Sequence, residues 1–149
     1  MNLIKHHSSV TVLLFYNLFF ADDVSIKTNA PESATAGSDF VVELTIDKAG
    51  VVGFAKLQQN LPEGMSAEVV DSKGASFTYS NGAIKLIWTQ LPEEAEFKIS
   101  YKVKVEDYVE GLQELEGKFS FISNNEKHTV DIPVISLNVG DEVVTEEPA

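Results

Sequence analysis

The stretch "SFTYSNGAIKLIW", Ser76–Trp88, predicts two short strands joined by a tight turn. Asn81-Gly82 is the strongest short hairpin signal, because both residues tolerate the positive φ angles of a type I′ turn. A two-residue loop gives one face a row of apolar pairs: Tyr79 with Ile84, Phe77 with Leu86 and Ala75 with Trp88. The opposite face is mostly polar, so turn chemistry and alternation agree independently. We therefore expect a hairpin that buries Trp88, the only tryptophan.

Further strands are predicted on both sides of this hairpin. Apolar and polar residues alternate over Phe40–Ile46 and over Phe97–Val105, the period of a strand with one buried face. A turn at Asn124-Asn125 would pair Phe119 with Val130 and Phe121 with His128. The sequence further predicts a final strand at Val134–Val139 and one helical turn within Glu106–Gly117.

Glycines and prolines separate these strands at short intervals, a spacing typical of sandwiches and barrels. No window of helical length shows a convincing 3.6-residue period. The fold class expected for residues 22–139 from this spacing is therefore all-β, a sandwich or a barrel. Residues 140–149, "GDEVVTEEPA", are expected to form an acidic flexible tail.

Residues 1–21 differ in character from the rest of the chain. A charged start precedes the mostly apolar run Val10–Ala21, and two aspartates follow it. This order is typical of a secretory signal peptide, and the run is shorter than the about 20 residues of a membrane span. We expect an exported protein, in the periplasm, at the cell surface or outside the cell, with no membrane insertion after cleavage. The alternatives are an N-terminal helix or strand of the domain, or an uncleaved anchor.

The charge balance excludes two classes of partner. The 11 basic residues, all lysines, face 23 acids, which gives a net charge of -12. Nucleic acids and anionic membranes both require positive charge, so neither is an expected partner. The chain has no cysteine, which excludes disulfides, thiolate metal sites and a cysteine nucleophile.

Several short motifs follow one another in an order seen in a known family. They are Ala36-Gly37 before a hydrophobic strand, "LPEG" at Leu61–Gly64, the tryptophan hairpin Ile84–Trp88, and Leu91-Pro92 before the strand "FKISYKVKV". From Val24 to Val139 the chain resembles an immunoglobulin-like repeat module of exported bacterial surface or envelope proteins, and more loosely a cohesin. The resemblance implies that the all-β fold is an immunoglobulin-like antiparallel β-sandwich. It also implies a role in display, spacing or interaction, with another envelope or surface protein as partner. It implies no catalytic residues.

The sequence offers residues for three kinds of reactive site, and each set has a simpler interpretation. Glu93, Glu94 and Glu96 cluster beside Pro92, where solvated turn residues are ordinary. Ser123, His128 and Asp131 lie too close in sequence on a predicted hairpin for a triad. Scattered acids leave calcium open, although the linear calcium-loop pattern is absent. The sequence therefore predicts no catalytic residues, no metal ligands and no cofactor, with calcium as a minor alternative.

The segment Gly53–Leu61, "GFAKLQQNL", admits two strand phases. Either Ala55, Leu57, Gln59 and Leu61 share the buried face, or Phe54, Lys56 and Gln58 do. Phe54 and Leu57 cannot both point to one side of a regular strand, so a bulge or an exposed apolar side chain is expected. The predicted interaction residues are Phe54, Lys56, Leu57, Gln58 and Tyr108. The predicted function is a non-catalytic structural or protein-interaction module; the alternative is a carbohydrate- or calcium-dependent binding domain.

Overall fold

The computed structural model describes residues 23–140, which form ten β-strands and no helix. None of these residues therefore belongs to a helix long and apolar enough to cross a membrane. The strands are β1 (Ser25–Asn29), β2 (Ser33–Thr35), β3 (Asp39–Asp47), β4 (Ala55–Asn60), β5 (Met65–Asp71), β6 (Ser76–Ser80), β7 (Ala83–Trp88), β8 (Glu96–Val105), β9 (Gly111–Ser123) and β10 (Glu126–Gly140).

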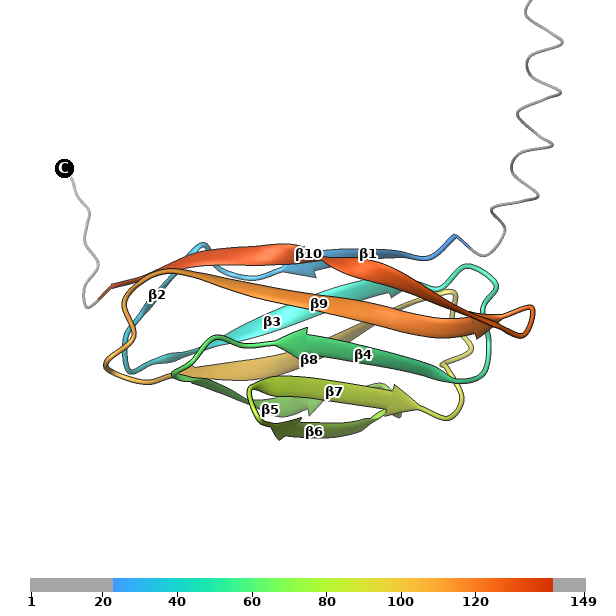
Figure 1. Ribbon diagram of the computed structural model, residues 1–149, viewed down its shortest axis with the longest axis horizontal. Helices are drawn as coiled ribbons and strands as arrows, with labels where there is room; N and C mark the ends of the chain where they lie inside the picture. The colour runs from blue at the N-terminus through green and yellow to red at the C-terminus, as the bar shows by residue number, and fades with distance from the viewer. Residues whose placement is uncertain (1–22, 141–149) are drawn as a thin grey trace, which may run out of the picture.

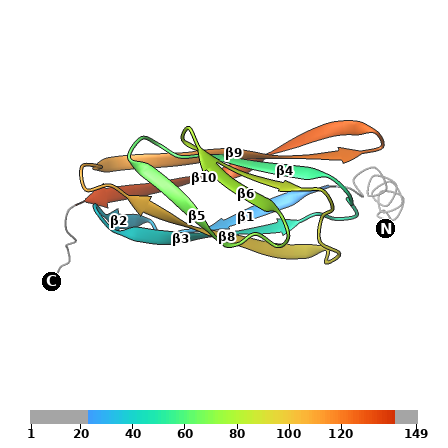
Figure 2. The same cartoon turned by 90° about the horizontal axis from the view of Figure 1, so that it is seen from below.

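The strands form two stacked sheets, as the all-β sandwich prediction requires. A four-stranded sheet has the order β1-β3-β8-β5, and a six-stranded sheet has the order β2-β10-β9-β4-β7-β6. In Figure 1 the two layers lie one in front of the other, with β5 and β6 at the lower edge, and Figure 2 views the sandwich from that edge. Neighbouring strands are antiparallel except for β2 and β10, which pair in parallel.

The core lies between the sheets and follows the alternation seen in the sequence. In β3, Phe40, Val42, Leu44 and Ile46 are buried, and the alternate residues of β8 from Phe97 to Val105 are buried against them. Each such side chain contributes about 1.5–3 kcal/mol when it leaves water. The two strands pair directly, with Leu44 opposite Ile99, so the long-range contact joins the two strongest alternating segments of the sequence.

The tryptophan hairpin has the predicted register. Tyr79 pairs with Ile84 and Phe77 with Leu86, around a turn in which Asn81 and Gly82 have φ angles of 51° and 77°. Trp88 is fully buried, with its ring 5.8 Å from that of Phe97 and 6.1 Å from that of Phe119. Its indole Nε1 donates a hydrogen bond to the carbonyl of Lys73 at 3.0 Å. The single polar atom of the tryptophan is thus paired inside an apolar site.

The second predicted hairpin is also confirmed. β10 pairs Val130 with Phe119 and His128 with Phe121, around the turn at Asn124-Asn125. These asparagines have φ angles of 54° and 64°, the values that a type I′ turn needs. The imidazole of His128 stacks on Phe121 with 5.4 Å between ring centres. His128 is therefore a packing residue of the hairpin.

One local prediction was wrong. The helical turn expected within Glu106–Gly117 does not form, because β9 begins at Gly111 and Leu115 pairs with Ile135 in the buried face. The final strand predicted at Val134–Val139 is confirmed as the last part of β10, which also contains the hairpin strand. The register shifts between Ile132 and Ile135, around Pro133. Proline has no N–H for the ladder, so a bulge is where a continuous strand accommodates it.

The predicted ends of the chain fall largely outside the described residues. The signal peptide expected at residues 1–21 lies there, as does the acidic tail apart from Gly140, which ends β10. The last strand therefore extends one residue beyond the predicted domain limit.

Candidate functional site

Strand β4 is the ambiguous segment of the sequence, and its phase is now defined. Ala55, Leu57 and Gln59 face the core, whereas Lys56 and Gln58 point to the outer face of the six-stranded sheet. Phe54, which precedes the strand, is 48% exposed, so the apolar side chain expected at the surface is this phenylalanine. Leu57 is fully buried and offers no surface to a partner, which corrects its place among the interaction residues.

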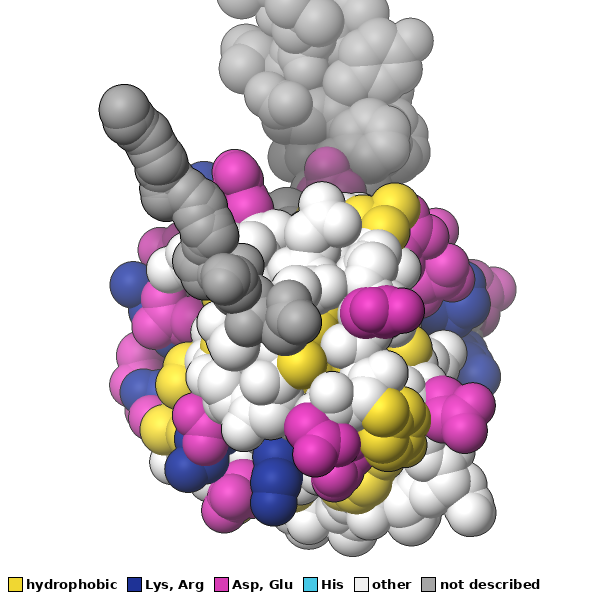
Figure 3. Space-filling model, turned by 90° about the vertical axis from the view of Figure 1, so that its left-hand side faces the viewer, with side chains coloured by type: hydrophobic (Ala, Val, Ile, Leu, Met, Phe, Trp, Pro, Cys, Tyr) yellow, Lys and Arg dark blue, Asp and Glu magenta, His cyan; other side chains and the backbone are white. Residues whose placement is uncertain are grey.

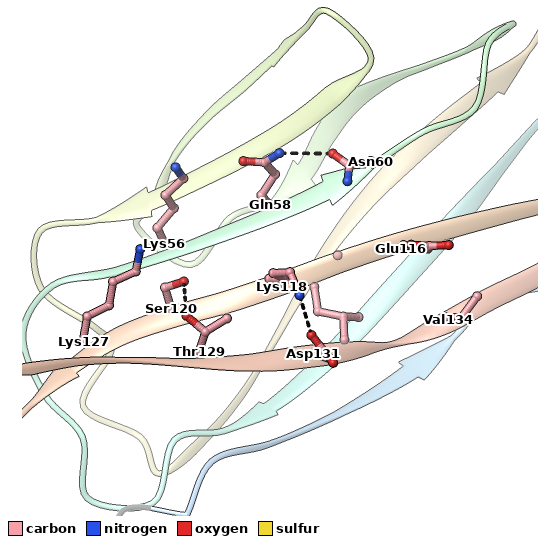
Figure 4. A pocket seen from close by; sticks show the side chains of 12 residues that line it. Lys56, Gln58, Asn60, Glu116, Lys118, Ser120, Lys127, Thr129, Asp131 and Val134 are labelled. Atoms are coloured by element: carbon pink, nitrogen blue, oxygen red, sulfur yellow. Dashed lines mark hydrogen bonds and ion pairs between the residues drawn. The ribbon is translucent and has the colours of Figure 1, made fainter.

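A groove of about 440 Å³ crosses the outer face of this sheet and is called the lysine groove here. Figure 4 shows its lining side chains on three adjacent strands. They come from β4 (Lys56, Gln58, Asn60), β9 (Glu116, Gly117, Lys118, Ser120) and β10 (Lys127, Thr129, Asp131, Ile132, Val134). Two of the predicted interaction residues, Lys56 and Gln58, therefore lie in one concave site.

The three lysines of the groove are not equivalent. Lys118 donates a hydrogen bond from Nζ to Asp131 Oδ1 at 2.8 Å, and this hydrogen bond and charge raise the pKa of Lys118. Lys56 and Lys127 have no ion pair among residues 23–140. Figure 4 shows Lys127 extending from β10 across β9 toward β4, the strand that carries Lys56. The groove thus presents two ammonium groups that have no ion pair among the described residues.

Neutral polar groups surround these cations. The hydroxyls of Ser120 and Thr129 lie 3.2 Å apart, and either can donate to the other. Gln58 Nε2 donates to Asn60 Oδ1 at 3.1 Å, which leaves the Asn60 amide N–H groups outside that bond. Because one proton of a hydroxyl pair remains unused, the site offers neutral donors beside its two cations.

The floor of the groove depends on a close approach between β4 and β9. A Cβ atom on Gly117 would lie 2.4 Å from the carbonyl oxygen of Gln58 and 2.2 Å from Gln59 Oε1. Gln59 itself is fully buried, and neither atom of its amide group has a hydrogen-bond partner among the described residues. Only glycine fits at position 117 without moving backbone atoms.

Tyr108 is exposed as expected but lies away from the groove. It belongs to the connection between β8 and β9, it is 65% exposed, and its ring approaches Gly64. That connection is at the left of Figure 1, opposite the β9–β10 turn. Figure 3 views this end and shows acidic side chains spread over it, with hydrophobic ones only in small separate areas. Tyr108 is therefore separate from the site on β4.

The residues that the sequence offered for reactive sites do not come together in such sites. Glu93, Glu94 and Glu96 are exposed on the connection from β7 and at the first residue of β8, outside the groove. His128 packs on the core side of β10, whereas Asp131 points outward to Lys118. Among residues 23–140, no three His, Cys, Asp or Glu side chains gather as metal ligands would.

Sequence reasoning missed the contribution of β9 and β10 to the site. The predicted hairpin register already places Lys118, Ser120 and Lys127 on the face opposite Phe119 and Phe121. The hairpin register does not show which strand lies beside the hairpin. Lys56 lies opposite Ser120 only because β4 pairs with β9. That pairing joins distant parts of the chain, so no local pattern reports it.

Comparison with known proteins shows the fold. No protein-family model and no curated protein sequence matches the chain. Among solved structures, the full-length major pilin SpaD from Corynebacterium diphtheriae superposes with a TM-score of 0.60 at 6% identity, covering 76% of this chain and 35% of the pilin. A putative membrane-anchored protein from the same organism gives 0.54 at 11% identity, covering 86% of this chain and 38% of that one.

A smaller protein is similar over nearly its whole length. The non-cellulosomal cohesin from Archaeoglobus fulgidus superposes with a TM-score of 0.50 at 16% identity, covering 76% of this chain and 91% of the cohesin. The chain thus spans little more than a third of the two corynebacterial proteins and most of a cohesin. It has the immunoglobulin-like, cohesin-like β-sandwich expected from its sequence.

Proposed function

We propose that this protein is a non-catalytic interaction module of an exported protein, and that its partner binds at the lysine groove. The observation that carries the proposal is the pair of uncompensated cations, Lys56 and Lys127, in a concave site on an otherwise acidic protein. The site is concave and brings charged and polar side chains of three strands together, as binding sites do.

The similar structures support the general part of this proposal, a structural or interaction role. They include a pilin, a membrane-anchored protein and a cohesin, which share the sandwich with this chain. A fold of this type hosts many functions, so the assignment rests on the groove itself. The proposed location is outside the cytoplasm, in agreement with the signal peptide expected at residues 1–21.

Site-specific photo-crosslinking in the native cells tests the proposal. A photoreactive amino acid in place of Ile122, which is 42% exposed and pairs with Lys127, leaves both lysines intact and should capture a defined partner protein, identified by mass spectrometry. The matched control carries the same amino acid in place of Val41, which is 50% exposed on the outer face of the other sheet. Equal capture from both positions, or no capture from position 122, would contradict the proposal.

The module is further proposed to act without a metal or enzymatic turnover. The full chain should hydrolyse no glycan or ester substrate, and its melting temperature should not change between millimolar calcium and chelator. Turnover that disappears in Glu93→Gln would identify an enzyme instead. A calcium-dependent rise in melting temperature would favour the calcium-dependent alternative.

A further inference from the structure

The two ends of the lysine groove differ in chemistry, which restricts the ligand. Lys56 and Lys127 lie toward the β9–β10 turn, next to the exposed apolar residues Phe54 and Ile122, which are 48% and 42% exposed. At the other end Val134 is 52% exposed beside the bulge of β10, and the acid Glu116 lies near it. A ligand that fills the groove therefore meets two lysines at one end, and at the other end an aliphatic side chain beside an acid that disfavours carboxylates there.

The charge of the groove favours an anionic ligand. Its lining holds three lysines and two acids, Glu116 and Asp131, so lysines are in excess. Asp131 pairs with Lys118, whereas Lys56 and Lys127 have no ion pair among residues 23–140. Elsewhere the chain is strongly acidic, so a ligand with negative charge is repelled from most of the surface and attracted here. The hydroxyl pair of Ser120 and Thr129 lies beside Lys56 in the register and supplies a further donor for an oxyanion.

The lining favours a peptide over a sugar polymer. None of the side chains that line the groove is aromatic, and Phe54 lies beside the lining and not in it, so sugar rings find no flat surface inside the groove on which to stack. The side-chain amides of Gln58 and Asn60 can both donate to and accept from a peptide backbone. Val134 offers contact for an aliphatic side chain, which an acidic glycan lacks.

We propose that the lysine groove binds an extended acidic peptide segment of a partner protein, with carboxylates on Lys56 and Lys127 and an aliphatic side chain against Val134. This inference rests on the proposed function and names the ligand of the same site. Positions 127 and 134 are seven residues apart on β10, so the segment spans about 23 Å, or about seven extended residues.

Fluorescence anisotropy with the full chain tests the inference. The probe is a labelled peptide with glutamates in its first half and valines in its second, compared with the same peptide carrying glutamines. The glutamate peptide should bind, more weakly as salt increases, and the glutamine peptide should not. Lys56→Gln and Lys127→Gln should each weaken binding by roughly two- to fivefold, and Val134→Ser should weaken it at constant charge.

Matched controls separate a site from general charge. Lys104→Gln makes the same charge change on the opposite face, where Lys104 has no ion pair among the described residues, and should leave affinity unchanged. Circular dichroism should show each variant folded. Equal weakening by Lys104→Gln would overturn the inference, as would stronger binding of oligogalacturonate than of the glutamate peptide.

Two further outcomes are diagnostic. Binding that becomes tighter when residues 141–149 are removed would identify the acidic end of the chain as the occupant and would overturn the assignment to a partner. Crosslinking from position 122 without any binding of the glutamate peptide would overturn this inference while leaving the proposed function intact. If neither crosslinking from position 122 nor binding of the glutamate peptide is observed, both the proposed function and this inference are rejected.

Discussion

Both outer faces of the sandwich carry lysines, but the faces differ in how many of these lysines form ion pairs with neighbouring acids. On the four-stranded sheet, Lys98 lies 3.9 Å from Glu43, and Lys102 lies 3.9 Å from both Asp39 and Glu68 on neighbouring strands. On the six-stranded sheet, Lys56 and Lys127 have no such partners within residues 23–140. The first face pairs Lys98 and Lys102 with its own acids, although Lys104 has no ion pair among the described residues, and the second face retains the charge of Lys56 and Lys127 for a ligand.

A row of lysines in a sequence therefore does not identify a binding face. In the most regular alternation of the chain, Phe97–Val105, Lys98 and Lys102 lie near acids of β3 and β5. The less regular segment around Lys56 faces strands that supply hydroxyls and amides instead. The neighbouring strand, and not the spacing of lysines, determines whether their charge remains available.

The largest effect is expected for a residue beside the groove lysine. Leu57→Ala should lower the free energy of unfolding by about 2–5 kcal/mol, because it leaves a cavity where a fully buried side chain was. Lys56→Gln, one position away on the outer face, should change it by less than about 0.5 kcal/mol. Urea denaturation of both variants measures the contrast. A comparable loss in Lys56→Gln would show that the outer face carries stability and is not reserved for binding.

A smaller loss is expected where β4 and β9 approach each other under the groove. Gly117→Ala should cost about 1–3 kcal/mol, because its Cβ would overlap the Gln58 carbonyl and the Gln59 side chain. Gly50→Ala is the control, since nothing lies within 4 Å of its added Cβ. Thermal and urea unfolding measure both. Equal stability of the two variants would mean that the strands separate without cost.

The inner side of the four-stranded sheet provides a test that depends on pH. Tyr101 is fully buried, its hydroxyl has no partner among the described residues, and burial raises its pKa. The unfolded tyrosine ionises near pH 10, so this residue contributes stability below that pH and loses it as the pH rises further. Tyr101→Phe should remove that loss and raise stability near neutral pH by about 1 kcal/mol.

Urea unfolding near neutral pH and at about pH 11 measures the effect of Tyr101→Phe. The difference in stability between the two conditions should be smaller in the variant than in the parent protein. A variant that is destabilised at neutral pH would indicate that the hydroxyl has a partner, for example an ordered water molecule.

The smallest effect on the free energy of unfolding is expected for lysines of the two outer faces. Lys102→Gln should cost about 0.2–1 kcal/mol, because it breaks two exposed ion pairs. Lys127→Gln should leave stability unchanged within error. The loss in Lys102→Gln should diminish at high salt, since its pairs are exposed. If Lys127→Gln costs the same as Lys102→Gln, the two faces are electrostatically alike.

Local patterns predicted a large part of the fold. Both hairpin registers were correct, because Asn81-Gly82 and Asn124-Asn125 select a turn and the alternation selects its register. The error lies where no local signal exists, because the helical turn predicted near Glu106 is replaced by pairing of Gly111 onward with β10. The predicted final strand is present, and what the sequence did not show is the bulge at Pro133 that joins it to the hairpin strand.

For the site, the sequence alone placed Phe54 and Tyr108 at the surface and left the phase of Gly53–Leu61 open. Composition determined the acidic charge, and period-two alternation determined which side chains are buried, because both are local properties of the chain. Only the tertiary structure brought β4 beside β9 and β10, buried Leu57 and set Lys56 and Lys127 in one groove. That result depends on backbone hydrogen bonds between distant strands, and such bonds are formed by atoms that every residue shares and no side-chain pattern encodes.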